Sequence, residues 1–383
     1  MAQCRDSPLW KRYQNAAEPG SNNAAPLHFR PMFSPARWLL ASGLFLAPGC
    51  GGPNHRPPTI DLAPGADPLE APVSDVTDAV WLGDDRWAII APQDRAVDLV
   101  DFSQRSITAF GAGKRAYEQP FYLFRAADSV VVDDWQLRRA TLWSLDGRMG
   151  RAVPAVDALR GALPRARDAR GHWYFELMPT AGTDGGGQHD SAAVVRTEPD
   201  FSRPDTVARL APLDMAEMIA EGRRRYERRL LSGQDRWGAL SDGSVWIARV
   251  GQNRVDWIDP EGQTHRGDAL PDKVLPVTEP DREIFLRRFP QELRATAEQI
   301  PFVPIKPPFE AAFAAPSGEI WLVKSRAVGD TLRSNQVVGR EGTLLREVRH
   351  HGHGRLLAAG PRRVLLAEPF EAGIRLYQLA LPE

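Results

Sequence analysis

The chain has 383 residues, which suffices for one large domain or two of ordinary size. Its 48 basic and 49 acidic residues nearly cancel, so no net charge favours nucleic acid or a strongly acidic substrate as a partner. Eleven tryptophans and 43% apolar residues exclude a disordered chain, and 32 glycines and 33 prolines are typical of many short strands and turns.

The first fifty residues are predicted to contain a targeting signal. Residues 1–31 are polar and patternless, and we expect them to be disordered or to precede a true start at Met32. Residues 32–50, "MFSPARWLLASGLFLAPGC", contain an apolar stretch of signal-peptide length that is too short to span a bilayer. The stretch ends at Cys50 and resembles a bacterial lipoprotein signal, although Ala47 stands where leucine is usual. A plain secretory signal and a buried N-terminal helix are the alternatives.

A lipoprotein signal implies that Cys50 is the site of lipidation and that the protein is exported to the cell envelope. It would be anchored to the periplasmic or outer-membrane face, with residues 51–57 as the tether. The only other cysteine is Cys4, so the mature chain has no disulfide, and neither a zinc site nor a redox pair is expected. Stability must then come from core size and topology.

The rest of the chain repeats one pattern. Each unit begins with an apolar strand, turns at Gly, Asp or Asn, and continues through three further strands. The units cover residues 76–111, 120–153, 164–210, 236–267, 309–348 and 354–381. Repeats of this length with four strands predict an all-β fold, a six-bladed β-propeller over residues 58–383. The last unit has three strands only, so we expect the N-terminal segment 58–64, "PTIDLAP", to complete blade six and close the ring.

Two stretches around blade four interrupt the strand pattern. Residues 213–231 place Met215, Met218 and Ile219 at helical spacing. Residues 277–299 begin with Thr278 and Asp281 at the positions of a capping box. Both stretches are predicted to be short helical excursions packed on one face of the ring.

Several segments resemble a known family. "GQNRVDWIDPEG" is similar to the repeat of NHL-like six-bladed propellers. "PVTEPDREIFLRRF", "KPPFEAAFAAPSGEIWLV" and "GIRLYQLAL" resemble a set of bacterial six-bladed propeller lipoproteins of unassigned function. The resemblance covers about 310 residues and implies that Asn253, Arg254 and Asp259 serve blade structure. It implies no catalytic residue.

The candidate site is the central channel, which the first strand of each unit lines. These strands carry Asp78, Arg165, Arg236 and Glu310 but no histidine, which favours a binding scaffold for an anionic ligand. The ligand is expected to be a small molecule or an envelope protein. The protein is expected to be a monomer without a cofactor. The alternative is a metal-dependent propeller enzyme of the lyase or lactonase type, which needs metal ligands converging from different blades.

Other polar clusters have plainer interpretations. Three histidines in "RHHGHGR" could bind Zn or Cu, but neighbouring loop residues rarely converge on a metal, and the preferred interpretation is an exposed linker between blades five and six. The insertion "GTDGGGQHD" could bind Ca²⁺ or be a tolerated loop. The run "EGRRRYERR" could meet anionic lipid or form a solvated helix face. Asp133 and Asp134 are adjacent on a strand, so they should point to opposite faces and not act as an acid–base pair.

Overall fold

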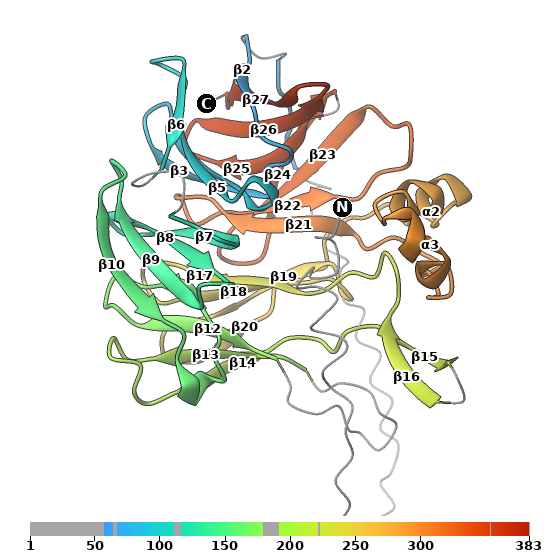
Figure 1. Ribbon diagram of the computed structural model, residues 1–383, viewed down its shortest axis with the longest axis horizontal. Coiled ribbons are helices and arrows are strands. Elements are labelled where there is room, and N and C mark those ends of the chain that lie inside the picture. Colours follow the sequence, from blue (N-terminus) through green and yellow to red (C-terminus); the bar gives the residue numbers. More distant parts are fainter. Residues whose placement is uncertain are drawn as a thin grey trace, which may run out of the picture. The chain divides into compact units, whose positions relative to one another are not determined.

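The computed structural model describes residues 57–63, 67–110, 116–178, 191–220, 223–352 and 354–382, and Pro57–Glu383 form one compact unit. Within this unit lie six sheets of four antiparallel strands, one of which is extended by a fifth, parallel strand (Figure 1). The first strands of neighbouring sheets contact one another, so each sheet is a blade and its first strand is the innermost. The predicted six-bladed β-propeller is confirmed.

The first three blades follow the chain order, from the innermost to the outermost strand. Blade one contains β3 (Asp78–Gly83), β4 (Arg86–Ala91), β5 (Ala96–Asp101) and β6 (Ser106–Ala109). Blade two contains β7 (Pro120–Ala126), β8 (Ser129–Asp134), β9 (Arg139–Ser144) and β10 (Met149–Pro154). Blade three contains β11 (Pro164–Arg167), β12 (Trp173–Leu177), β13 (Ala193–Thr197) and β14 (Asp205–Arg209). Two single-turn 3-10 helices, η2 (Pro92–Asp94) and η3 (Asp157–Leu159), lie in connections.

The last three blades follow the same scheme. Blade four contains β17 (Arg236–Ala239), β18 (Val245–Arg249), β19 (Arg254–Ile258) and β20 (Thr264–His265). Blade five contains β21 (Phe309–Ala314), β22 (Ile320–Lys324), β23 (Leu332–Val338) and β24 (Leu344–His351). Blade six contains β25 (Arg355–Ala359), β26 (Arg363–Phe370) and β27 (Gly373–Ala380), with its fourth strand supplied from the N-terminal side.

The core is divided among the blade interfaces. The buried apolar side chains of the described residues form six clusters, one between each pair of neighbouring blades. A central strand therefore packs on both faces, which is why β4 and β22 read as continuous apolar runs, without alternation. Tryptophans fill these interfaces, and the buried ones are Trp87, Trp143, Trp173, Trp237, Trp246, Trp257 and Trp321.

The ring is closed by an N-terminal strand, but not by the segment that the sequence suggested. Blade six is completed by β2 (Leu69–Ala71), which pairs with β27. The segment 58–64 contains β1 (Thr59–Asp61) instead, which pairs in parallel with β24 at the outer edge of blade five. The assignment of "PTIDLAP" to blade six was therefore wrong. Leu69 and Ala71 are buried in the core between blades six and one, whereas Glu70 between them is exposed. This alternation of buried and exposed side chains is the one expected of a strand at the edge of blade six.

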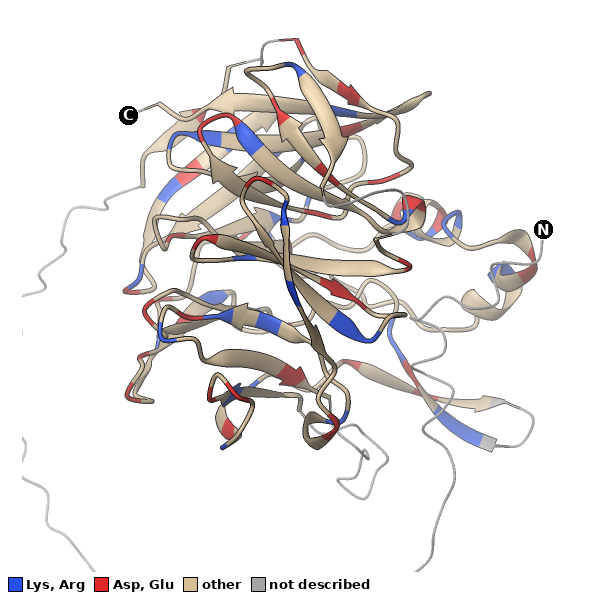
Figure 2. Ribbon diagram, turned by 60° about the vertical axis from the view of Figure 1, so that its left-hand side comes forward, with Lys and Arg blue, Asp and Glu red and all other residues tan. Residues whose placement is uncertain are grey.

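Residues 213–231 do not form the predicted helix. They contain a hairpin of β15 (Met215–Ala220) and β16 (Arg223–Arg228), paired from Met215 with Arg228 to Ala220 with Arg223. Arg224 of β16 forms a 2.9 Å ion pair with Glu217 of β15 across the two strands. Figure 2 shows a continuous basic stretch on β16, whereas acidic and basic residues alternate over the blades. The apolar stripe is not buried as a helix would require, since Ile219 is 78% exposed.

Residues 277–299 are helical, as predicted, and form α2 (Glu279–Leu286) and α3 (Gln291–Ala297). The capping box is present: the backbone N–H and the hydroxyl of Thr278 both donate to Asp281, at 2.9 and 2.7 Å. No helix among the described residues is both long and apolar enough to cross a membrane.

Candidate functional site

The six innermost strands all start at the same end of the propeller axis, because every blade runs in the same direction from its first strand. Five of these strands carry a charged residue at or next to their first position, and they are β3, β11, β17, β21 and β25. β7 contributes Tyr122 instead, which is paired with Asp133 of β8. We use the name axial cluster for Asp78, Tyr122, Asp133, Arg165 and Arg236. They come from blades one to four.

Arg165 and Arg236 bring two positive charges into the axial cluster. Neither guanidinium forms a hydrogen bond or an ion pair with any residue in the described part of the chain. Burial, together with the nearby charges of Arg228 and Arg165, lowers the pKa of Arg236. Arg165 instead stacks on aromatic rings, with its Cζ atom 4.5 Å from the ring centre of Tyr122 and 5.7 Å from that of Phe121. The two guanidinium groups thus lie near each other without a hydrogen-bonded carboxylate partner in the described part of the chain, and the acidic groups on which their charges act are Asp78 and Asp133.

Asp78 contributes a carboxyl group with altered acidity. Loss of hydration raises its pKa to about 7, even though a hydrogen bond from the Ala79 N–H and the charges of Arg355, Arg165 and Arg236 act in the opposite direction. At neutral pH this group therefore exists in both its protonated and its ionised form. Perturbed carboxyl groups of this kind concentrate at functional sites.

Tyr122 adds a neutral hydroxyl. Burial, the charge of Asp78 and, more weakly, that of Asp133 raise its pKa to about 12, while Arg165 and Arg236 act against the shift. The phenol is therefore protonated at physiological pH and can donate a hydrogen bond to an anion.

Asp133 lies beside Tyr122, its partner in the ladder between β7 and β8. It is only 3% exposed, and its Oδ1 atom has no hydrogen-bond partner among the described residues. Burial raises the pKa of Asp133 well above its ordinary value, with Arg165 opposing the shift. Asp134 has a different role, since its carboxylate accepts bonds from the backbone N–H groups of Glu118, Gln119 and Leu137. The expectation that these two aspartates point to opposite faces agrees with these contacts.

Of the four predicted channel residues, three come together. The charges of Arg165 and Arg236 both act on Asp78, so these three share one environment. Glu310, at the start of β21, is exposed, and its charge acts on Arg333 of β23. Arg355, at the start of β25, connects the two groups because its charge acts on both Asp78 and Arg333. The sequence interpretation did not assign Tyr122, Asp133 or Arg355 to the channel, and it considered Asp133 only as a possible acid–base partner of Asp134.

The histidine cluster does not form an exposed linker. His350 is part of β24 and only 3% exposed; its Nε2 lies 3.1 Å from the carbonyl oxygen of Gly354 and its Nδ1 3.5 Å from the Nδ2 of Asn335. Burial lowers the pKa of His350. His351 is exposed, and His353 lies outside the described residues. Within the described ranges, no group of three or more His, Cys, Asp or Glu side chains is arranged to hold a metal ion.

Several other predicted residues also lie outside the described part of the chain. They are Cys50, Asp184, His189 and Asp190. The arginine run belongs to β16 and the residues after it, where Arg228 donates to Ser232 and Gln234, and Arg229 pairs with Asp214 at 3.2 Å. Asn253 and Asp259 serve the blade, since Asn253 donates to the Leu270 carbonyl and Asp259 accepts from the Gln263 N–H.

No protein-family model and no curated protein sequence matches the chain. Solved structures similar to it include a member of the DUF4221 family from Bacteroides vulgatus, with 8% identity, a TM-score of 0.47, and coverage of 82% of this chain and 94% of that one. Virginiamycin B lyase from Staphylococcus aureus has 9% identity, a TM-score of 0.44, and coverage of 83% and 99%. A calcium-binding regucalcin from Agrobacterium tumefaciens has 8% identity, a TM-score of 0.41, and coverage of 85% and 97%. The class of this protein is the six-bladed β-propeller, which its own blades define.

Proposed function

We propose that this propeller is a binding scaffold that recognises an anionic group, a carboxylate or a phosphate, at the axial cluster. The observation that carries the proposal is the pair of guanidinium groups of Arg165 and Arg236, which lie together without a carboxylate partner. Two like charges that lie close together without a paired carboxylate are unfavourable, so this arrangement is best explained by an anion that both groups bind.

The neighbouring groups suit the same ligand. Arginine presents several N–H donors in a planar fork that matches the oxygens of carboxylates and phosphates. Tyr122 supplies a further neutral donor beside Arg165. Arg236 is exposed, so the cluster is open to solvent and to a ligand from that side. A small molecule and an acidic segment of an envelope protein both carry the required group.

The proposal includes a place for the protein. The apolar stretch that ends at Cys50 supports export and lipidation of this cysteine, and the compact unit begins only seven residues later, at Pro57. Attached lipid chains would hold the propeller at the cell envelope on a short tether. Labelling cells with a radioactive fatty acid tests this part: the chain should be labelled, and Cys50→Ser should abolish the label while Cys4→Ser keeps it. Label retained in Cys50→Ser would disprove it.

Calorimetric titration of residues 57–383 with citrate and with inorganic phosphate tests the binding site. Binding of at least one of these probes should be weakened by about tenfold or more when Arg165 and Arg236 are both changed to Gln, because each charged hydrogen bond contributes about 1.5–3 kcal/mol. Arg266→Gln is the matched control, since Arg266 is exposed and belongs neither to the axial cluster nor to the group of Glu310, Arg333 and Arg355. Unchanged binding in the double variant, or an equal loss in the control, would refute the proposal.

A further inference from the structure

A second polar site lies at the opposite end of β11 from Arg165. It is a cavity of about 340 Å³ lined by the end of β13, the start of β14 and the adjoining connections of blade three, together with Pro260 of blade four. Its charged lining consists of Arg170, His172, Arg196, Glu198, Arg203 and Asp205. The volume is at the lower end of the range for ligand pockets, so the cavity suits a small ligand.

A buried carboxylate fixes the orientation of His172. Asp168 is 6% exposed, and its Oδ2 lies 2.7 Å from Nδ1 of His172, while its Oδ1 accepts the backbone N–H of the same residue at 2.9 Å. The hydroxyl of Tyr174 donates to the same carboxylate at 3.1 Å. Nδ1 of His172 is therefore the protonated nitrogen, which leaves Nε2 on the side of Glu198, at 3.6 Å from its carboxylate.

The cations of the cavity exceed its anions. Arg196 is engaged, since it donates to the carbonyl oxygen of Pro260 at 3.2 Å and pairs loosely with Asp205 at 3.4 Å. Arg170 and Arg203 are exposed, and neither forms a hydrogen bond or an ion pair within the described part of the chain. Among the residues that the structure describes, the Glu198 carboxylate has His172 as its only ion-pair partner. Two guanidinium groups thus remain available at the rim of a cavity that already contains a third.

We infer that this cavity is a second anion site, which takes a small tetrahedral oxyanion: inorganic phosphate or the phosphate group of a small phosphomonoester. Arg170 and Arg203, which lie in two different connections of blade three, can each donate to oxygens of a tetrahedral anion, and Arg196 of β13 adds a third positive charge beside them. A phosphate offers more oxygens to these donors than a carboxylate does. The oriented His172 adds a fixed imidazole edge next to them. This inference does not depend on the axial cluster, which involves none of these residues.

Calorimetric titration of the full chain with inorganic phosphate at low ionic strength, repeated with glycerol phosphate, tests the inference. Besides any binding at the axial cluster, we expect a phosphate-binding event that survives in the Arg165→Gln, Arg236→Gln double variant and is weakened at least tenfold in the Arg170→Gln, Arg203→Gln double variant. Tighter binding of glycerol phosphate would identify a phosphomonoester as the ligand, and tighter binding of inorganic phosphate would identify the free ion.

The controls separate this site from general charge attraction. Arg266→Gln removes an exposed arginine elsewhere and should leave phosphate binding unchanged. Arg170→Lys, Arg203→Lys keeps both charges and should retain part of the affinity, even if the Gln variants fold poorly. Absence of phosphate binding in the unaltered chain, or unchanged binding in the Arg170→Gln, Arg203→Gln variant, would overturn the inference. Loss of binding only in the Arg165→Gln, Arg236→Gln variant would also overturn it and would assign phosphate to the axial cluster.

Discussion

Arg165 of β11 and Arg236 of β17 bring two guanidinium groups from neighbouring blades together, and no carboxylate in the described part of the chain pairs with either one. The propeller scaffold explains how this is possible. Its stability comes from six interfaces between blades, which lie behind the innermost strands. The starts of these strands can therefore carry groups that do not favour folding.

The first prediction concerns how much the repulsion between Arg165 and Arg236 lowers the free energy of unfolding. Changing Arg236 to Gln should raise the free energy of unfolding by about 0.5–1 kcal/mol, because one of two neighbouring positive charges is removed. The gain should shrink at high salt, where the repulsion is screened. Urea unfolding at low and high salt measures both effects, with Arg266→Gln as the control. A loss of stability that is independent of salt would show that the two charges do not repel each other significantly.

The second prediction concerns Asp78. Its pKa is raised in the folded protein to about 7, above the ordinary value of 3.8, so the folded state holds a proton that the unfolded state loses. Stability from this group is therefore fully present below about pH 4 and is lost as the pH rises to about 7. Asp78→Asn should be nearly neutral at about pH 4, and at about pH 8 it should stabilise the protein by roughly 1–2 kcal/mol, a value reduced because the group is partly exposed.

Urea unfolding of Asp78→Asn at both pH values checks this prediction. Asp98→Asn is a useful comparison, since burial also raises the pKa of Asp98, outside the axial cluster. If Asp78→Asn had the same effect at both pH values, the carboxyl would not titrate differently in the folded and unfolded states.

The third prediction concerns the cap of α2. Despite the effect of burial, which acts the other way, hydrogen bonds from Lys306 and Thr278 hold the pKa of Asp281 below its ordinary value. Its stabilisation is therefore present above about pH 4 and is lost as the pH falls through the lowered value. Asp281→Ala should cost about 1–2 kcal/mol at neutral pH and less in acid. Unfolding followed by circular dichroism measures this, and a cost that did not decline in acid would contradict it.

The blades were predictable because their signals repeat. A strand buried on both faces needs a continuous apolar run, and such runs recur in "RWAII", "SVVV" and "IWLV", each preceded by a turn. Once the runs are aligned, the strand before each one is the innermost. Asp78, Arg165 and Arg236 could therefore be assigned to the axis from the sequence.

The remaining axial residues depend on details that the sequence does not show. Tyr122 stands in the run "PFYLF" and resembles a core residue, but the ladder between β7 and β8 shifts its register between Pro120 and Tyr122. A β-bulge of this kind changes which side chains face the axis. Asp133 lies on β8, the second strand of blade two, and not on an innermost strand. It comes near Arg165 because it is paired with Tyr122 of β7, and the sequence does not show this pairing.

The hairpin β15–β16 shows a different difficulty. Met215, Met218 and Ile219 fit a helix, yet Glu221 and Gly222 stand between the halves, and a short segment that ends in glycine is typical of a hairpin turn. Glu217 and Arg224 pair across the strands, but residues seven positions apart would also lie on one face of a helix, two turns from each other. Charge spacing therefore did not distinguish between the two structures, and the glycine was the better signal.

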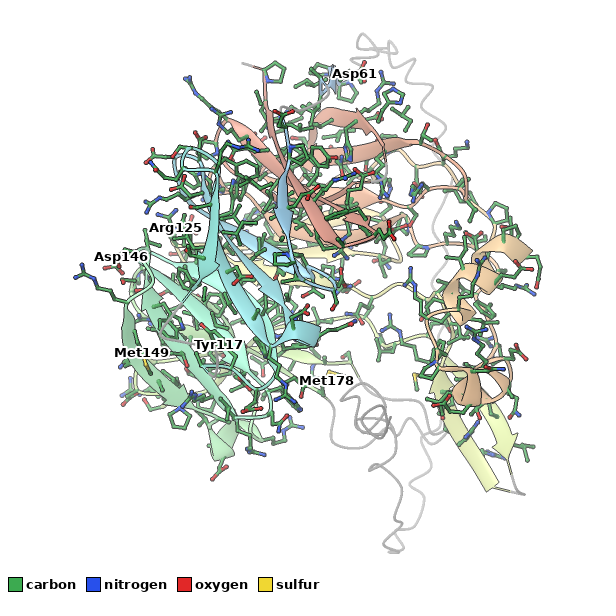
Figure 3. All side chains as sticks on the ribbon, turned by 45° about the horizontal axis from the view of Figure 1, so that its top comes forward. Asp61, Tyr117, Arg125, Asp146, Met149 and Met178 are labelled. Carbon is green, nitrogen blue, oxygen red and sulfur yellow. The ribbon has the colours of Figure 1, made fainter. Side chains whose placement is uncertain are left out.

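The ring closure leads to the last prediction, which compares β1 with β2. Leu69 of β2 is 6% exposed and packs in the core between blades six and one, so Leu69→Ala should cost about 2–3 kcal/mol. Ile60 of β1 is only partly buried, and Asp61 beside it, labelled in Figure 3, forms two exposed hydrogen bonds with Arg349, at 2.7 and 2.9 Å. Ile60→Ala should cost roughly half as much.

Truncation extends the same comparison to whole strands. A chain that starts at Asp67 lacks β1 but keeps β2, and it should still unfold in one cooperative transition. A chain that starts at Ser74 also loses the buried Leu69, Ala71 and Val73, so blade six keeps an open edge and roughly 4–6 kcal/mol is lost. Urea unfolding of the three chains, starting at Pro57, Asp67 and Ser74, measures both steps. If the larger loss came with the removal of residues 57–66, the closing strand would be β1, and the pairing of β2 with β27 would contribute little to stability.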